Sequence, residues 1–340
     1  MTMRVAVYRS NADVRVETAD RPAIGDGEVL VRVMACGICG SDVAEWFRVP
    51  KAPRILGHEI SGVVAESRTG GYAPGDRVVV RNQVPCGRCH ACRYGHPAVC
   101  EDQAEIEPGG MAEYVRVPAE VVAAGLTPLP AHLPYPAGTL AEPVACVLHA
   151  QELAGIAAYQ TVVVYGCGAF GLLHVQVARG AGVRRVVAVD RVAWRRRAAE
   201  RVGATLALGP GDDVAGSLRR LGDGRLADLA VLATGAPAAL SSASGVLNRH
   251  GTVLLFGAPE PGRPVPVTLN QLFWRRELTV VSSYGAGDVD LARALELVDK
   301  GVVDSDVMIT DVLPLAEVQR GFGLVAAAGD SLKVVLDLAP

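Results

Sequence analysis

Apolar and polar residues alternate along the first quarter of the chain, which is the pattern of half-buried β-strands. Apolar side chains occupy nearly every second place in residues 3–9 and 28–35, and a Pro/Gly turn separates these segments. Two further apolar segments, residues 60–67 and 76–82, are joined by a Gly-containing loop. A period of two residues places apolar side chains on one face of a sheet. We therefore predict that this part of the chain is mostly β-structure.

The pattern becomes helical after Pro136, where residues 137–153 read as one helix. From Thr161 onward, short apolar strands alternate with helices, which is typical of a doubly wound parallel sheet. The last part of the chain is predicted to contain two amphipathic helices and a final strand, at residues 291–301, 315–327 and 331–338.

These changes of pattern predict an α/β protein of two domains. Residues 1–150 form a β-rich domain, and residues 151–283 form the doubly wound domain. Residues 284–340 return to the first domain. A chain of 340 residues is long enough for two domains of ordinary size.

Composition and charge exclude some classes of function but do not identify one. Half of the residues are apolar, a fifth are charged, and the formal net charge is −3, so we expect a soluble protein with no general affinity for nucleic acid or a membrane. Residues 1–10 lack the apolar core of a signal peptide, and the most apolar long run, 162–178, is interrupted by glycines. We therefore expect a cytoplasmic protein whose eight cysteines are thiols or metal ligands.

Four cysteines lie in a short lobe at residues 86–100, with the spacing C-x2-C-x2-C-x7-C. They are Cys86, Cys89, Cys92 and Cys100. Four thiolates on a turn-rich loop can close around one tetrahedral ion, which is typical of a structural zinc site. An iron–sulfur cluster is the alternative, because closely spaced cysteines also hold such clusters. The neighbouring His90 and His96 are interpreted as loop residues.

A second group of possible metal ligands lies between Ala35 and Glu59. It combines a thiol, a hydroxyl, two carboxylates and an imidazole, at Cys39, Ser41, Asp42, His58 and Glu59. Zinc accepts this mixture of S, N and O ligands. The wide spacing fits a catalytic metal, whose ligands come from separate elements. The alternative is a buried thiol with a helix-capping Asp42.

Glu142 lies in an apolar segment before Pro143. An unpaired carboxylate is costly to bury there, so Glu142 is a further candidate site residue. The alternative is a carboxylate that interacts with the N-terminal end of a helix dipole. The remaining thiols, Cys36, Cys146 and Cys167, are interpreted as buried and neutral.

A glycine-rich turn follows the strand that begins at Thr161. It contains Gly166, Gly168 and Gly171, and Asp190 ends the next strand. The first glycine permits a tight turn, the second lets a pyrophosphate approach the backbone, and the third lets the helix pack on the strand. This context predicts a dinucleotide site, in which Asp190 accepts from the ribose. The arginines that follow, at residues 195–197, leave NADP open as the alternative to NAD.

Taken together, the motifs GICGSD, GHE, the four-cysteine lobe, AEP and GCGAFG resemble the zinc-dependent medium-chain dehydrogenase/reductase family over essentially the whole chain. The resemblance is to its sorbitol and threonine dehydrogenase branch. It implies a GroES-like catalytic domain and a Rossmann domain. It also implies one catalytic zinc, one structural zinc, NAD as cofactor and a homodimer or homotetramer.

The resemblance also assigns roles to individual residues. Cys39 and His58 ligate the catalytic zinc, with Glu59 and Glu142 as its carboxylates. Asp42 accepts from the far nitrogen of His58, and Ser41 takes the proton of the substrate. The residues assigned to the cofactor are Gly166, Gly168, Ala169, Phe170, Gly171, Asp190, Arg195 and Thr234.

The implied reaction is reversible hydride transfer between a secondary alcohol and a nicotinamide, and the substrate is a polyol, sugar, cyclitol or hydroxy-amino acid. Many family members carry a histidine where this chain has Ala44, so the proton route is left open. Candidate substrate residues are Glu45, Trp46, Glu105 and Tyr284. The acidic ones suggest an amino-bearing substrate.

Two other hypotheses stay open. One is a simple alcohol dehydrogenase or an NADP-dependent ketone reductase. The other, of a different class, is a zinc- and nucleotide-binding protein without catalysis. The apolar segment 265–281 is the expected edge strand through which copies of the chain associate.

Overall fold

The computed structural model describes residues 1–257, 259, 261–262, 264–265, 268–287, 289 and 291–339. Ala258, at the end of the strand that the apolar run 250–258 predicts, and Pro266 and Val267, in the expected edge segment 265–281, lie outside these residues. Among the described residues, no helix combines the length and the apolar character needed to cross a membrane. The chain divides into unit 1, residues 1–145, 287–301 and 308–340, and unit 2, residues 146–286 and 302–307.

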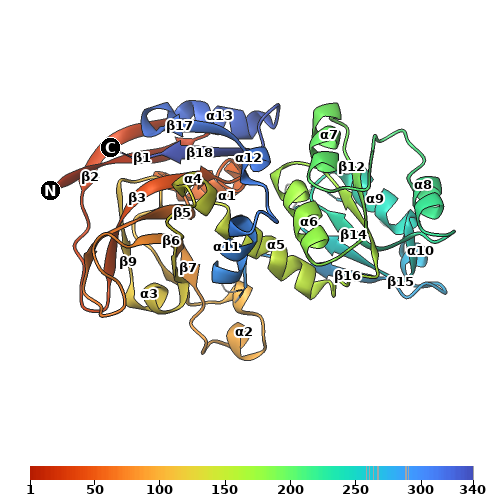
Figure 1. Cartoon of the computed structure of the whole chain (residues 1–340), viewed down its shortest axis with the longest axis horizontal. Helices are drawn as coiled ribbons and strands as arrows, with labels where there is room; N and C mark the ends of the chain where they lie inside the picture. The colour runs from red at the N-terminus through yellow and green to blue at the C-terminus, as the bar shows by residue number, and fades with distance from the viewer. Residues whose placement is uncertain are drawn as a thin grey trace. The chain divides into compact units, whose positions relative to one another are not determined.

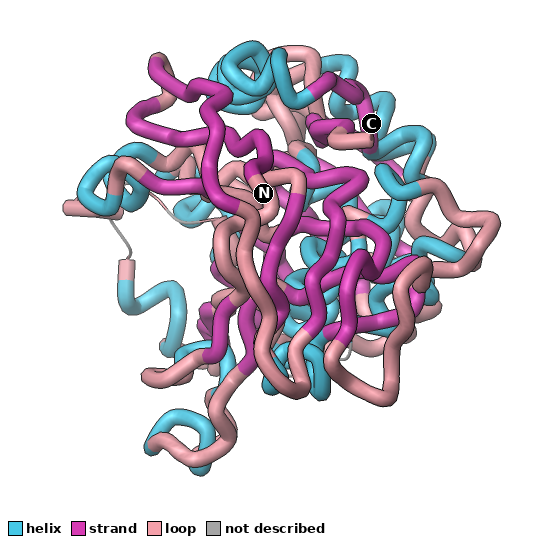
Figure 2. The backbone as a smooth tube through the Cα atoms, turned by 90° about the vertical axis from the view of Figure 1, so that its left-hand side faces the viewer, coloured by secondary structure: helices cyan, strands magenta, loops and turns pink. Residues whose placement is uncertain are grey.

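Unit 1 is built mainly from antiparallel β-structure, as the alternating pattern predicts (Figures 1 and 2). Within the described residues its larger sheet has the order β10-β6-β5-β3-β18-β17, with β9 paired to β3, and a smaller sheet has the order β2-β1-β4. β7 and β8 form a separate hairpin. The strands are β1 Thr2–Ser10, β2 Asp13–Asp20, β3 Val29–Ile38, β4 Arg54–Ile55, β5 Glu59–Ser67, β6 Arg77–Arg81, β7 Gln83–Val84, β8 Ala104–Glu105, β9 Tyr114–Val117, β10 Leu126–Pro128, β17 Ile309–Pro314 and β18 Lys333–Asp337.

The inward side chains of these strands form one apolar core. Val31 and Val33 of β3 are fully buried and pack with residues of the neighbouring strands and with Phe322. β3 lies between β5 and β18, so the start of β5 and the start of β18 meet beside the end of β3. This arrangement brings together segments that are far apart in the sequence, and it positions the first candidate site.

Short helices complete unit 1. The expected helix at residues 137–153 is in fact two helices, α4 and α5, because Thr139 and Leu140 interrupt it before Pro143. The helices are α1 Glu45–Arg48, η1 Val49–Lys51, α2 His90–Arg93, η2 Pro97–Val99, α3 Ala119–Gly125, α4 Tyr135–Gly138, α5 Ala141–Leu153, α11 Leu291–Asp299, α12 Ser305–Met308, η3 Leu315–Glu317 and α13 Val318–Ala327. Of these, α5 continues into unit 2, and α12 lies mostly in unit 2.

Unit 2 contains the predicted doubly wound parallel sheet (Figure 1). Six strands in the described part of the chain pair in the order β13-β12-β11-β14-β15-β16, and every pair is parallel. The strands are β11 Thr161–Tyr165, β12 Arg185–Val189, β13 Leu206–Leu208, β14 Ala227–Leu232, β15 Leu247–Leu255 and β16 Thr279–Ser282. The helices are α6 Ala169–Gly180, α7 Ala193–Arg201, α8 Val214–Leu221, α9 Pro237–Gly245 and α10 Leu269–Phe273.

Alternate residues of each strand face opposite layers, which explains the nearly continuous apolar runs. Val162 and Val164 pack with α5 and α6 on one face. Val163 and Tyr165 pack with α8 and α9 on the other. A parallel sheet covered on both faces needs apolar residues at every position. The α/β fold class is therefore confirmed.

Candidate metal and cofactor sites

The end of β3 and the start of β5 bring the first group of ligands together. Cys39 follows β3 directly, and His58 precedes Glu59, the first residue of β5. The possible ligand atoms of these three side chains all lie within 4.8 Å of one another. Cys39 and Glu59 are buried. A thiolate, an imidazole and a carboxylate at this separation match the ligand set of a catalytic zinc site.

Asp42 is fully buried beside this cluster. Its Oδ2 accepts from the backbone N–H of Cys39 at 3.1 Å, and its Oδ1 accepts from Arg48 Nη2 at 3.1 Å. His58 Nδ1 lies 3.6 Å from Asp42 Oδ1, which is beyond a normal hydrogen bond. Arg48 also donates to Ser41, to Oγ at 3.2 Å and to the backbone oxygen at 3.0 Å. Arg48 therefore holds both polar side chains of this loop.

Glu59 forms a buried ion pair with Lys333. Lys333 Nζ lies 2.6 and 2.8 Å from the two carboxylate oxygens of Glu59, and both side chains are almost completely buried. The pair meets across the end of β3, where Gly37 is opposite Glu59. A Cβ at Gly37 would lie 1.9 Å from Glu59 Oε2. Glycine is therefore required at this position because the carboxylate occupies the space of its side chain.

Negative charge dominates the surroundings of His58. Burial alone would lower the pKa of His58, but Asp42, Cys39 and Glu142 outweigh it and raise that pKa well above its ordinary value. In the same way, burial opposes the ammonium form of Lys333, but Glu59, Cys39 and Glu142 raise its pKa. A cluster in which thiolate and carboxylate charges favour a nearby cation also suits a bound zinc ion.

The four-cysteine lobe also fits a metal ion. The ligand atoms of Cys86, Cys89, Cys92 and Cys100 all lie within 4.8 Å of one another. Cys89 Sγ lies 3.8 Å and Cys86 Sγ 3.5 Å from Cys100 Sγ, and a tetrahedral site with Zn–S bonds of about 2.3 Å has edges of about 3.8 Å. Backbone N–H donors lower the pKa of Cys89 to about 6, whereas desolvation and the neighbouring thiols raise that of Cys92 to about 12. A cation would stabilise all four thiolates, so this lobe fits a structural zinc.

The glycine-rich turn joins β11 to α6. Gly166 has a φ of 88°, which favours glycine. A Cβ at Gly171 would lie 1.7 Å from the backbone oxygen of Gly166. At Gly168, the N-cap of α6, a Cβ would meet only Arg195 Nη1, at 3.9 Å. Gly168 therefore borders free space at a helix N-terminus, where a pyrophosphate would be held by backbone N–H groups.

The other residues assigned to the cofactor surround this turn. Asp190 is buried, and its carboxylate accepts from the backbone N–H groups of Cys167 and Val192, both at 2.7 Å. Thr234 lies near Gly166, because a Cβ there would be 3.0 Å from that of Thr234. Ala169 and Phe170 begin α6, and the ring of Phe170 packs against Phe256. Each of Asp190's carboxylate oxygens keeps acceptor capacity for a ribose hydroxyl.

Gly171→Ala is expected to destabilise unit 2 by about 1–3 kcal/mol and to weaken cofactor binding, because the added methyl overlaps a backbone oxygen. Gly168→Ala is the matched control. Its φ of −70° is accessible to alanine, so it should fold normally and lose only cofactor affinity. Calorimetric unfolding and cofactor titration measure the two effects separately. Equal stability of both variants would contradict the packing role of Gly171.

The four predicted substrate residues lie at different places. Glu45 accepts from the backbone N–H of Asn11 at 2.9 Å, and Trp46 is half exposed. Glu105 forms an exposed ion pair with Arg54 at 3.5 Å. Tyr284 is exposed and belongs to unit 2.

Sequence reasoning missed Lys333 and Arg48. A signal existed for Lys333, which is the one lysine of three that falls in a predicted strand. Arg48 offered no comparable signal, since arginine is common throughout this chain. The other thiols, Cys36, Cys146 and Cys167, are buried as expected, and burial raises the pKa of Cys167 to about 12.

Comparison with known proteins gives the same picture over the whole chain. Residues 25–130 match the alcohol dehydrogenase GroES-like domain, and residues 169–300 match the zinc-binding dehydrogenase family. The chain is 32% identical to erythritol/L-threitol dehydrogenase of Mycolicibacterium smegmatis, over 98% of this chain and 97% of that protein. It is 33% identical to L-threonine 3-dehydrogenase of Bacillus velezensis, over 98% of each chain.

A solved structure described as a zinc-binding dehydrogenase from Sinorhizobium meliloti 1021, bound to NADP, is 32% identical and superposes with a TM-score of 0.88 over 99% of both chains. The three sites described above, which are the Cys39 cluster, the four-cysteine lobe and the glycine-rich turn, fit such a dehydrogenase. The chain therefore belongs to the zinc-containing medium-chain dehydrogenase/reductase family, as an NAD(P)-dependent enzyme of its polyol and threonine dehydrogenase branch.

Proposed function

We propose that the protein transfers a hydride between a secondary alcohol of a polyol, sugar or cyclitol and NAD. The observation that carries this proposal is the cluster of Cys39, His58 and Glu59 with the hydroxyl of Ser41 on the adjoining loop. An enzyme of this family needs a metal site and a proton acceptor together. The similarity to an erythritol/L-threitol dehydrogenase and to a threonine dehydrogenase supports a small hydroxylated substrate.

Cys39 and His58 would hold the catalytic zinc, with Glu142 as the third protein ligand. Glu142 is the better carboxylate for this role because both oxygens of Glu59 already accept from Lys333, while the charge of Glu142 acts on His58. When bound, the zinc ion supplies Lewis acidity, which favours loss of the proton of a substrate alcohol. Asp42 lies on the far side of His58 and would hold the ring in place through electrostatic attraction.

Ser41 would accept the substrate proton. Arg48 donates to Ser41 Oγ, so the hydroxyl oxygen is fixed in position. As this oxygen takes the substrate proton it would release its own hydroxyl proton, so that no net charge builds up on Ser41. Ala44 supplies no side chain to continue a relay, and Glu45 is engaged by Asn11. The proton would therefore leave Ser41 through solvent rather than through a second side chain.

NAD is the proposed cofactor because Asp190 places a buried negative charge at the end of β12, where a 2′-phosphate would be repelled. Arg195, whose Nη1 lies close to Gly168, is the residue that could favour NADP instead. Because the similar structure from Sinorhizobium meliloti is bound to NADP, activity must be assayed with both cofactors.

An amino-bearing substrate is the finer hypothesis. Glu105 and Glu107 would attract a cation, although each also pairs with an arginine, at 3.5 Å in both cases. Trp46 could stack on a carbohydrate face. Because of these residues, aminosugars and aminocyclitols are included among the test substrates below.

Association of copies of the chain would use the edge of the unit 2 sheet. β16 is the outermost strand on that side, and Val280, Leu269 and Phe273 expose apolar surface beside it. An uncovered apolar edge favours pairing with another strand. We therefore propose a homodimer or homotetramer.

The test is turnover by the full-length chain on polyols, sugars, aminosugars, aminocyclitols, L-threonine and short alcohols, with NAD and with NADP. Nicotinamide absorbance follows the reaction, and zinc content and molar mass are measured on the same sample. We expect NAD-dependent turnover of a secondary alcohol and its loss in Ser41→Ala. Turnover only of short alcohols, or only with NADP, would favour the simple alcohol dehydrogenase or ketone reductase. Zinc binding without turnover of any alcohol would favour the non-catalytic alternative.

A further inference from the structure

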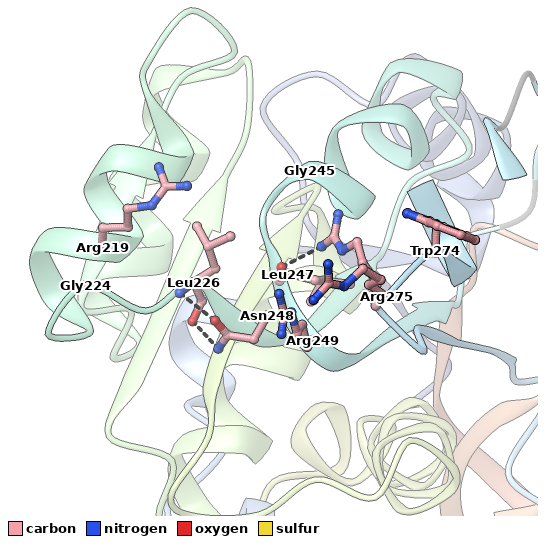
Figure 3. Close-up of a pocket in the computed structure, with 10 residues that line it drawn as sticks. Arg219, Gly224, Leu226, Gly245, Leu247, Asn248, Arg249, Trp274 and Arg275 are labelled. Carbon is pink, nitrogen blue, oxygen red and sulfur yellow. Dashed lines mark hydrogen bonds between the residues drawn. The ribbon is translucent and has the colours of Figure 1, made fainter. Parts of the chain in front are cut away.

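A second binding site is suggested by an arginine-lined pocket in unit 2. The pocket has a volume of about 550 Å³. Figure 3 shows Arg219 on one side and Arg275 with Trp274 on the other, with Arg249 and Asn248 between them. The side chains come from α8, from β15 and from the segment after α10. None of them has been assigned to zinc or to the nicotinamide cofactor.

The lining carries strong positive charge without compensation. It contains four arginines and no carboxylate among the described residues, although the chain as a whole has a net charge of −3. Arg276 Nη2 donates to the backbone oxygen of Leu247 at 2.7 Å. Within the described residues, Arg219, Arg249 and Arg275 form no ion pair. Like charges repel, so a pocket of this kind favours a bound anion.

Two carboxylates that flank the pocket have partners of their own. Glu277 is paired with His250, at 3.1 Å, and Asp223 with Arg185, at 3.2 Å. The floor of the pocket is held by Asn248, whose side-chain oxygen accepts from the N–H of Leu226 and whose nitrogen donates to the backbone oxygen of Leu226, both at 2.9 Å. These bonds fix the backbone of the floor, and Arg219, Arg249 and Arg275 are exposed side chains that line the pocket above it.

The backbone around the pocket is strained. Arg275 has a φ of 58°, and the flanking residues Asp223, His250 and Glu277 have φ values of 53°, 63° and 51°. They are four of the five non-glycine residues with positive φ in the described part of the chain. Such conformations cost energy and concentrate at functional sites. The strain is an observation independent of the charge.

We propose that this pocket binds the phosphate groups of a small phosphorylated ligand. Guanidinium groups form paired hydrogen bonds with phosphate oxygens. Arg219, Arg249 and Arg275 come from three different elements and would hold the phosphates from separate sides. The indole of Trp274, which is 64% exposed in the single chain and belongs to the segment 265–281 proposed for association, offers a stacking surface for a base. The proposal does not depend on the substrate of the dehydrogenase.

The test is calorimetric titration of the full-length chain with tripolyphosphate, in the presence of saturating NADH so that the glycine-rich turn is filled. Arg249→Gln/Arg275→Gln removes two guanidinium groups of the pocket, and Arg219→Gln removes one from a different helix. Arg201→Gln is the matched control, because Arg201 is exposed in the same unit, at the end of α7, and lies outside the lining. We expect at least a tenfold rise in Kd for the double variant, a smaller rise for Arg219→Gln and none for Arg201→Gln.

Titrations with ADP and with pyrophosphate under the same conditions identify the source of the phosphate. If ADP binds more tightly than pyrophosphate, and if Trp274→Ala weakens the binding of ADP, the natural ligand is a nucleotide. Equal binding of the two would support a simple phosphate site. Equal Kd values for tripolyphosphate in all the arginine variants and the unmodified chain would overturn the proposal. So would arginine variants that change only the molar mass of the protein, because the face would then be an interface between copies of the chain.

Discussion

Lys333→Met is expected to destabilise unit 1 by about 3–5 kcal/mol, which is the cost of leaving a buried carboxylate without its partner. Lys333 Nζ contacts both oxygens of Glu59, and the two side chains are 3% and 0% exposed. Methionine has a similar length and no charge, so it would leave Glu59 charged and unpaired, or force it to take up a proton. Denaturant unfolding followed by circular dichroism measures the change.

Two variants control this experiment. Lys333→Met/Glu59→Gln removes the charge from both positions and should recover much of the lost stability, because no ion is then left unpaired. Lys300→Met removes an exposed lysine that pairs with Glu296 along one helix, and it should leave stability unchanged. The same loss of stability in Lys333→Met and Lys300→Met would show that the buried pair has no special role.

Cys39→Ser is expected to remove the zinc of the first site and to lower alcohol oxidation by about 10³-fold, since Lewis-acid catalysis contributes several kcal/mol. Serine keeps the size of the side chain, but a neutral hydroxyl is a much weaker zinc ligand than a thiolate. Elemental analysis should show the metal content falling from about two zinc ions per chain to about one. Steady-state kinetics on the best alcohol of the panel measure the loss of activity.

Cys36→Ala is the matched control for this variant. Cys36 is also a buried thiol, three residues earlier and within β3, and its replacement should leave zinc content intact. Cys39→Ser protein with unchanged zinc content and unchanged turnover would refute the role of Cys39. Loss of both metals in Cys39→Ser would point to misfolding of unit 1 instead.

The hydrophobic pattern was sufficient to predict the fold class, because the two units bury their strands in different ways. Alternating residues such as those of 3–9 mark sheets with one face in the core, and the continuous apolar run 162–165 marks a parallel sheet covered on both faces. Element boundaries were less certain. The predicted helix at 137–153 is two helices, α4 and α5.

Residues close together in the sequence could also be grouped without a structure. The four cysteines of the lobe lie within one loop, and the three glycines of the turn join adjacent elements, so local spacing fixes their geometry. Cys39 and His58 are further apart, but both belong to recognisable short motifs. For these sites, the residue types and their spacing along the chain were sufficient for the prediction.

Tertiary structure alone decided which distant side chains meet beside the metal site. Lys333 reaches Glu59 because β18 and β5 flank β3, and Gly37 leaves room for the contact. Local spacing cannot predict a pairing across 274 residues, since it depends on strand order and register. Nor could it predict the arginine pocket, whose members come from three separate elements. The sequence by itself determined the two units and their motifs, and strand pairing determined which charges meet.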